Sequence, residues 1–163
     1  MKTAILKEMI GRIQEDNGFL IVKADQEGAK VPPLPYATYK VTSPYIKGRG
    51  RGAFTQFVDE GSGAAYEKFT EQPLTTISFN VFADDVDEAR ELAIQLRNWF
   101  TFAGTPYLQD RDIVVRSAGN VENRTTHLID HYEYKHGFDV QLRTEEEQVR
   151  LMTESIETIE IGG

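Results

Sequence analysis

The chain has no cysteine among its 163 residues, only three histidines and a single tryptophan. The lack of cysteine excludes disulfide bonds, thiol catalysis and zinc sites built on cysteine. No run of about 18 apolar residues occurs, so the sequence predicts no membrane-spanning helix. The first residues do not form a secretory signal, because Lys7 and Glu8 interrupt them before an apolar segment develops.

The chain has fewer basic than acidic residues: 18 lysines and arginines against 26 aspartates and glutamates, which gives a formal net charge of -8. Such a chain is repelled by phosphate at long range, which argues against a general nucleic-acid binder. The same charge suits a protein that lets DNA pass without holding it, and it also suits plain solubility. Hydrophobic residues make up 40% of the chain, so a core can form. The length predicts one domain, residues 1–163.

Groups for chemistry are also sparse. His127 and His131 stand four apart, and on the strand expected here that spacing separates them by about 13 Å, too far for one metal ion, while His136 falls on the opposite strand face. The carboxylates of residues 84–88 crowd a helix start, where the helix dipole favours negative charge. No P-loop, Rossmann fingerprint or nucleophile elbow occurs. We therefore expect no catalytic residue, no cofactor site and no metal site.

Two helices are predicted from apolar residues that recur every three or four positions. The first covers residues 2–16 and ends at Asn17-Gly18, which tolerate the left-handed conformation. The second runs from Asp85 to Phe102. Asp85 and Glu88 have the spacing of a capping box, and Gly104 is placed to end the helix.

Alternation of apolar and polar residues predicts the strands. Residues 71–83 read as one long strand that buries Ile77, Phe79, Val81 and Ala83. Residues 131–143 alternate throughout, and their length, roughly 44 Å if flat, predicts a bulge or bend at Gly137. Shorter strands are expected at residues 19–23, at residues 36–42 (ended by Ser43-Pro44) and at residues 112–116. A further strand at residues 123–129 is expected to pair back on residues 112–116.

Residues 47–72 form a separate feature. Residues 53–60 and 64–71 resemble the arms of a hairpin turned at Gly61-Ser62-Gly63, with so little apolar content that it stands away from the core. The preceding Lys-Gly-Arg-Gly-Arg-Gly run is expected to be mobile because alternate glycines keep its backbone entropy high. Its charges, Lys47, Arg49 and Arg51, are either a contact for a partner or an ordinary solvated loop.

The C-terminal extension, residues 144–163, begins with an expected solvated break at Glu145-Glu146-Glu147. Weak strands are expected at residues 149–152 and 156–161, and we expect the extension to pair with another sheet, for instance in a neighbouring copy. The predicted class is therefore α+β: a mainly antiparallel sheet, with an N-terminal helix and a central amphipathic helix packed on it, plus a projecting hairpin. The core is expected to end near residue 143.

Four segments resemble the neck or tail-terminator proteins of tailed bacteriophages. They are Glu71-Gln72-Pro73-Leu74-Thr75-Thr76-Ile77-Ser78-Phe79-Asn80-Val81-Phe82-Ala83, Leu96-Arg97-Asn98-Trp99-Phe100, Tyr132-Glu133-Tyr134-Lys135-His136-Gly137-Phe138-Asp139-Val140, and Tyr36-Ala37-Thr38-Tyr39-Lys40-Val41 after a proline-rich arm. The similarity covers most of residues 1–143. These segments are patterns of strand and helix, and none is a chemical signature.

The resemblance implies a non-enzymatic virion protein that assembles in the host cytoplasm into a ring, usually a hexamer. The ring caps the tail tube, joins it to the head connector and lets DNA pass without sequence-specific binding. Lys47, Arg49 and Arg51 become candidates for contact with the tube or the lumen. Two other classes stay open: a small-ligand or nucleotide-processing α+β enzyme, which needs a pocket of titratable groups, and a monomeric adaptor, which needs one apolar patch.

Overall fold

The structure, a computed structural model, describes residues 1–152. Its helices are α1 (Thr3–Asn17), α2 (Val86–Asn98), the π-helix η1 (Trp99–Ala103) and α3 (Thr105–Asp110). The strands of a larger sheet are β1 (Leu20–Lys23), β2 (Tyr36–Ile46), β5 (Leu74–Ala83), β6 (Val114–Ala118), β7 (Glu122–Asn123), β8 (Thr126–His127) and β9 (Tyr132–Arg143). A smaller sheet contains β3 (Ala53–Val58), β4 (Ala65–Glu71) and β10 (Glu146–Leu151).

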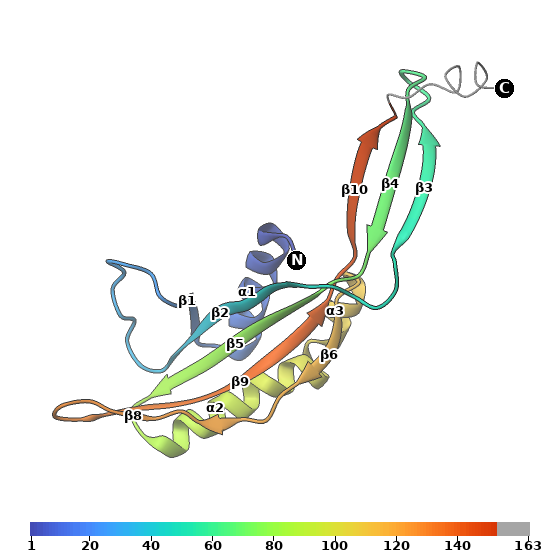
Figure 1. The fold of residues 1–163 in the computed structure, drawn as a ribbon. Coiled ribbons are helices and arrows are strands. Elements are labelled where there is room, and N and C mark those ends of the chain that lie inside the picture. The colour runs from blue at the N-terminus through green and yellow to red at the C-terminus, as the bar shows by residue number, and fades with distance from the viewer. Residues whose placement is uncertain (153–163) are drawn as a thin grey trace.

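The larger sheet and the helices form what we call the body. The sheet has the order β1-β2-β5-β9-β6, and α1 and α2 cover one of its faces (Figure 1). All its pairings are antiparallel except that of β1 with β2. The predicted α+β class, with a mainly antiparallel sheet, an N-terminal helix and a central helix, is confirmed.

Every second residue of β5 is buried, and these side chains form the centre of the core of the body. Ile77, Phe79 and Val81 have no exposed surface, and they point toward the buried residues Met9 and Ile13 of α1. The next strand, β9, pairs with β5 without a register shift from Leu74↔Arg143 to Ala83↔Tyr134. Complete burial of a large apolar side chain is worth about 1.5–3 kcal/mol, so this face supplies much of the stability.

Helix α2 begins as the sequence predicts and ends differently. The Asp85 side chain accepts hydrogen bonds from the backbone N–H groups of Asp87 and Glu88, at 2.8 and 2.9 Å. The expected single α-helix to Phe102 is wrong beyond Asn98, because the last turn widens into η1. The Gly104 N–H then donates to the Trp99 carbonyl at 2.7 Å, so Gly104 does close the helix.

Two strand predictions are corrected at prolines. The run expected as one strand over residues 71–83 is divided at Gln72-Pro73 into β4 and β5, which belong to different sheets. Strand β2 does not end at Ser43-Pro44 but continues to Ile46. The register with β5 shifts on both sides of Ser43. Pro44 therefore lies in an irregular stretch, where its missing N–H removes no regular ladder bond.

The bulge expected at Gly137 is absent, because the β5–β9 register runs through this position. Instead, the absence of a side chain at Gly137 lets atoms of neighbouring segments approach the backbone closely. A Cβ atom here would lie 2.3 Å from the Asn80 side-chain oxygen and 2.4 Å from the Phe79 carbonyl oxygen. It would also lie 2.8 Å from the Arg124 guanidinium, which therefore crosses the strand at this point.

The smaller sheet stands away from the body, and we call it, with its loops (residues 47–72 and 144–152), the arm (Figure 1). Its β3–β4 hairpin confirms the predicted projection. The break expected at Glu145-Glu146-Glu147 is wrong, because β10 begins at Glu146 and pairs antiparallel with β4 of the same chain. The part of the extension that the structure describes therefore pairs within its own copy.

The strand expected at residues 156–161 lies outside the described residues. The single-domain assignment of residues 1–163, with a core ending near residue 143, stays a prediction. Within residues 1–152 the structure has no helix long and apolar enough to cross a membrane.

Candidate assembly surface

Both faces of the arm are open to solvent. Every residue of β3 is exposed, every residue of β4 is half-buried, and β10 is exposed beyond Glu146. The body sheet, in contrast, buries one face under helices. A sheet ordinarily needs a second layer on at least one face, so the arm lacks the cover that a stable sheet has.

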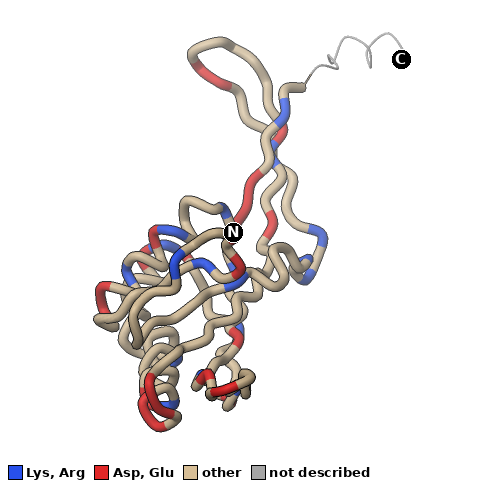
Figure 2. Tube along the Cα trace, turned by 90° about the vertical axis from the view of Figure 1, so that its left-hand side faces the viewer, with Lys and Arg blue, Asp and Glu red and all other residues tan. Residues whose placement is uncertain are grey.

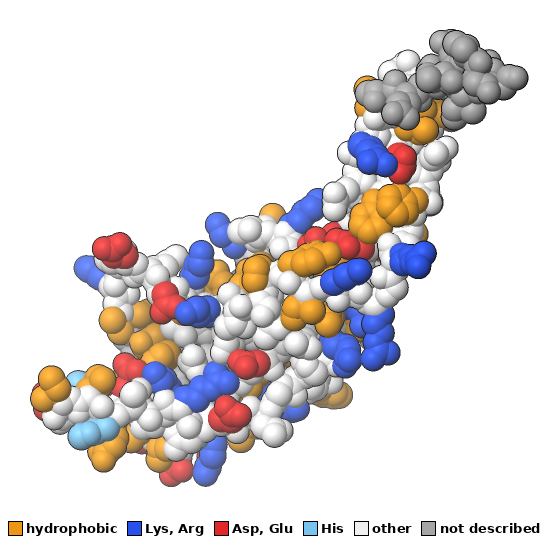
Figure 3. All heavy atoms as spheres, in the orientation of Figure 1, with side chains coloured by type: hydrophobic (Ala, Val, Ile, Leu, Met, Phe, Trp, Pro, Cys, Tyr) orange, Lys and Arg blue, Asp and Glu red, His pale blue; other side chains and the backbone are white. Residues whose placement is uncertain are grey.

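Large apolar side chains lie on both faces of the arm, and Figure 3 shows those on the side in view. On one face Phe57 stacks on Tyr66, with ring centroids 5.4 Å apart, and the strand register places Leu151 beside Tyr66. On the other face Phe54 packs on Phe69 at 4.7 Å. The Phe54 side chain remains 65% exposed and that of Leu151 53%. Exposed apolar groups on both faces indicate a surface that another protein covers.

The predicted contact residues Lys47, Arg49 and Arg51 lie together at the base of the arm and are exposed (Figure 2). Their loop lies against the chain rather than apart from it. A Cβ atom at Gly48 would lie 2.3 Å from the Gln72 carbonyl oxygen, and one at Gly52 would lie 2.4 Å from the Phe69 ring. The loop borders a hollow of about 350 Å³, which Glu71 and Glu145 also line.

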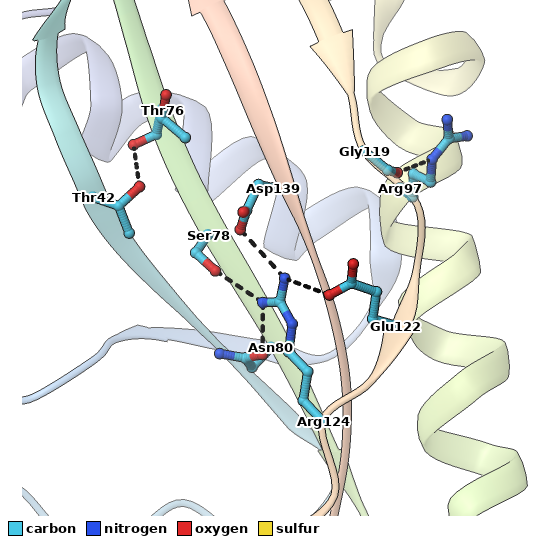
Figure 4. Close-up of polar contacts among 9 residues, drawn as sticks. All are labelled: Thr42, Thr76, Ser78, Asn80, Arg97, Gly119, Glu122, Arg124 and Asp139. Atoms are coloured by element: carbon cyan, nitrogen blue, oxygen red, sulfur yellow. Dashed lines mark hydrogen bonds and ion pairs between the residues drawn. The ribbon is translucent and has the colours of Figure 1, made fainter.

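The uncovered face of the body sheet carries a polar network centred on Arg124 (Figure 4). Its Nη1 atom donates to the Ser78 hydroxyl at 2.9 Å and to the Asn80 side-chain oxygen at 3.1 Å. Its Nη2 atom lies 3.4 Å from Asp139 and 3.6 Å from Glu122. Because the guanidinium is shared among four partners across three strands, we assign it a role in holding β7 on the sheet.

The histidines are not arranged for catalysis. The strand expected through His127 and His131 is wrong, because β8 ends at His127 and the chain turns back, with the Leu128 N–H donating to the His131 carbonyl at 2.7 Å. His136 is buried on β9, where burial and the nearby Arg90 lower the pKa of its imidazole. Within residues 1–152 no three histidine or acidic side chains gather into a potential metal site.

A hollow of about 700 Å³ lies between α1 and the α2–η1 segment. The Asp16 carboxylate at its wall accepts hydrogen bonds from Trp99 Nε1 at 2.8 Å and from Arg12 Nε at 3.1 Å. These donors, Trp99 above all, lower the pKa of the carboxyl group. A carboxylate held ionised by two donors ties α1 to η1; it is not the raised-pKa acid that general acid catalysis needs.

Sequence reasoning found the arm's hairpin and its basic loop but missed two parts of the surface. It expected a weak strand at residues 149–152 but did not place it on the arm, because the pairing of β10 with β4 leaves no local signal in the sequence. It also did not predict that Phe102, at the end of η1, is 82% exposed. That exposure follows from the widened π-turn, which no pattern of apolar spacing reveals.

An α+β body with a projecting sheet that exposes aromatic side chains on both faces is typical of a structural subunit. Comparison with known families identifies which kind. The family model described as phage neck terminator protein matches residues 3–163, so the chain belongs to that family. It is a structural protein of the phage neck and thus a component of the virion. A comparison with curated protein sequences gives no significant match.

Proposed function

We propose that the chain is the ring-forming subunit of the neck. Six copies form a ring that caps the head-proximal end of the tail tube and joins it to the head connector, and the ring assembles in the host cytoplasm. DNA passes through the central opening without sequence-specific contact. The protein has no catalytic role, and its partners are its own copies, the tube protein and the connector proteins.

The observation that carries this proposal is the arm. A three-stranded sheet with no buried residue in its strands cannot draw its stability from the body, and it presents aromatic side chains to solvent on both faces. A partner that covers it recovers roughly 25 cal/mol for each Å² of apolar surface. The net charge of -8 supports the passage of DNA, because like charges keep a phosphate backbone from binding.

The enzyme alternative finds less support. Within residues 1–152 no three histidine or acidic side chains gather into a potential metal site, and the carboxyl group with the clearest role, Asp16, has a lowered pKa set by structural donors. The adaptor alternative predicts one contiguous apolar patch, whereas apolar side chains lie on both faces of the arm. Two opposite faces suit repeated contacts better than one partner.

Electron microscopy of the purified protein, alone and mixed with tail tubes, tests the proposal. We expect annular particles, at least at the ends of tubes. A monomer in dilute solution does not decide the matter, because a terminator subunit can stay monomeric until it meets a tube. Persistent absence of annular particles and of tube-end caps at high protein concentration contradicts the proposed function.

The basic loop is tested in phage assembly with Lys47→Gln, Arg49→Gln and Arg51→Gln combined. We expect the fold to persist, because these side chains are exposed, and the yield of infectious particles to fall by about tenfold or more, the effect of losing roughly 1.4 kcal/mol of contact. A matched control replaces exposed Lys2, Lys7 and Lys30 by Gln, with the same change of charge. Equal yields from both triple variants remove the loop from the contact.

A further inference from the structure

We infer that the copies join through the two free edges of the arm, with β3 of one copy lying beside β10 of the next. The three-stranded sheets then continue from copy to copy around the ring. This inference rests on the proposed ring and names the surface that closes it. The occupant of each edge is a second copy of this chain.

Within residues 1–152 neither outer edge of the arm sheet, β3 or β10, pairs with a further strand, so the edge of β3 presents unpaired backbone groups. The Asp59 N–H donates inward to the Ala64 carbonyl at 2.9 Å, and the antiparallel β3–β4 register from Ala53↔Thr70 to Val58↔Ala65 is unbroken. Since alternate residues of an antiparallel strand face the same neighbour, Phe54, Gln56 and Val58 direct their N–H and C=O groups outward. An exposed edge with an unbroken register is a template for strand addition.

The opposite edge, β10, is equally open. The Met152 N–H donates inward to the Ala65 carbonyl at 3.0 Å, so the same alternation turns the backbone groups of Leu151, Val149 and Glu147 outward. The register of β10 with β4 is unbroken over its six residues. The arm therefore carries two complementary edges rather than one.

The edges of the body sheet are less suited to addition. On one side β1 is only four residues long. On the other side β6 has a register shift between Val115 and Ser117, and Arg97 donates to the carbonyl groups of Ala118 and Gly119 at 2.9 and 2.7 Å. Short, bulged or occupied edges resist pairing with another chain. The arm is thus where strand addition meets least obstruction.

Strand direction favours a ring over a pair. Both β3 and β10 run antiparallel to β4, so they run parallel to each other. A rotation that carries one copy to the next can bring β3 beside the next β10 with both strands pointing the same way. Each copy then uses both edges, and the contact closes when the rotation completes a circle. Pairing of β3 with another β3 would need a two-fold axis and would stop at a dimer.

Charge supports the same arrangement. The basic residues Lys47, Arg49 and Arg51 directly precede β3 at the base of the arm, whereas Glu145 and Glu147 stand at the start of β10, also at the base. Parallel pairing places the base of one arm beside the base of the next, so the basic loop, which already shares a hollow with Glu71 and Glu145 of its own copy, also lies near the exposed glutamates of the next copy. Strand β3 itself contains no charged residue, so a β3–β3 contact would lack this attraction.

The lack of cysteine permits a direct test by disulfide cross-linking. Thr55→Cys is combined in turn with Glu147→Cys, Val149→Cys or Leu151→Cys, residues that share one face of the sheet by the strand register. Within one copy β4 separates β3 from β10, so their Cα atoms are about 9.5 Å apart or more, beyond the reach of a disulfide. Any cross-link between them joins two copies.

We expect at least one of these pairs to give, on oxidation of the assembled protein, a ladder of covalent multimers that ends at the ring size. Thr55→Cys alone should give no dimer above the level of a cysteine placed at exposed Lys30. A strong dimer from Thr55→Cys alone, or rings by electron microscopy without a ladder from any of the three pairs, overturns the inference. The second result leaves the proposed function standing, whereas absence of rings in the wild type overturns both.

Proline on the free edge gives an independent test. Gln56→Pro removes an outward N–H and leaves the bonds of β3 to β4 in place, whereas Gln56→Ala keeps the N–H. We expect Gln56→Pro to reduce rings or tube-end caps about tenfold or more relative to Gln56→Ala, at a similar midpoint of thermal unfolding. Undiminished rings from a folded Gln56→Pro protein overturn the inference.

Discussion

The body and the arm are both antiparallel sheets, yet only the body has a core. In β5 the apolar residues alternate strictly, so Ile77, Phe79 and Val81 all meet the helices. In β3 the two phenylalanines are three positions apart, Phe54 and Phe57, which places them on opposite faces. The body sheet is covered by helices of its own chain, whereas the pattern of the arm sheet is that of a sheet covered by another protein.

This difference separates two kinds of stability. Burial in the body contributes to the folding of a single copy, whereas burial on the arm contributes only once a partner is present. Substitutions in the body should therefore change unfolding of the monomer, and substitutions on the arm should change assembly. The first of four predictions tests that separation, and the other three test contacts within the body, in order of decreasing effect on the monomer.

The largest effect is expected from Phe79→Ala. This side chain is completely buried and lies between Phe100 and Phe138, with ring centroids 5.4 and 5.5 Å away. Removing it leaves a cavity that the surrounding rings fill only in part, so the free energy of unfolding should fall by about 3–5 kcal/mol. Denaturant unfolding of the monomer, followed by circular dichroism, measures the loss.

The matched substitution on the arm is Phe57→Ala. Because this ring is 43% exposed and packs mainly on Tyr66, the monomer should lose less than about 1 kcal/mol, while rings or tube-end caps should decrease. If Phe57→Ala destabilises the monomer as much as Phe79→Ala, the arm is part of the folding core and the separation fails.

The second prediction concerns Gly137→Ala, where one methyl group meets fixed neighbours. The Phe79 carbonyl belongs to the central β5 strand and cannot move without disturbing the β5–β9 ladder. We expect a loss of about 1–3 kcal/mol, the usual cost of forcing extra atoms into a packed site. The comparison is Gly11→Ala in α1, where a Cβ meets nothing within 4 Å. There alanine should stabilise by about 0.5–1 kcal/mol, because glycine weakens a helix interior. If both substitutions change the free energy of unfolding in the same direction, the packing argument is contradicted.

These two glycines also show how far sequence reasoning reaches. Alternation identified β5, β9 and their buried faces, because the period of two and burial on one face are one physical fact. It failed at Gly137, where the sequence predicts a bend but the glycine makes room for Asn80 and Arg124. Those neighbours come from β5 and from the segment between β7 and β8. Contacts between segments far apart in sequence leave no local signature.

Some parts of the candidate assembly surface could likewise be predicted from the sequence and others could not. The hairpin around Gly61 and the basic loop were predictable, since glycine spacing and charge are local. The addition of β10 to β4 was not, because strand pairing depends on where the chain returns, and Glu146 and Glu147 read as a solvated break. Their charges are accommodated at an exposed strand, with Glu147 3.6 Å from Lys68. Charged residues are common on exposed strands, so charge alone does not exclude a strand.

The third prediction is Asp16→Asn, which weakens the tie between α1 and η1. The charged acceptor receives hydrogen bonds from Trp99 and Arg12, and replacing it with a neutral amide should cost about 1–2 kcal/mol at pH 7. Because the pKa of Asp16 is lowered in the folded state, its stabilisation is present above the ordinary value of 3.8 and is lost as pH falls through the lower native value. The difference between wild type and variant, measured by thermal unfolding, should therefore narrow below pH 4. A difference independent of pH contradicts the ionic role.

The smallest effect is expected at His136, the buried histidine of β9. Burial first, and then the positive charge of Arg90, lower the pKa of its imidazole, while Asp87 acts in the opposite sense. The folded protein thus binds the proton less readily than the unfolded chain. The neutral imidazole makes its full contribution to the stability of the folded state above the ordinary pKa of 6.5. That contribution decreases as pH falls from 6.5 through the lower native pKa.

His136→Gln should remove this component, so that its unfolding midpoint declines less than that of the wild type between pH 7 and pH 5. Both proteins share every other titrating group, so the difference between the two curves isolates the imidazole. If His136→Gln and the wild type give the same slope, the buried imidazole of the body contributes nothing to the acid sensitivity of the fold.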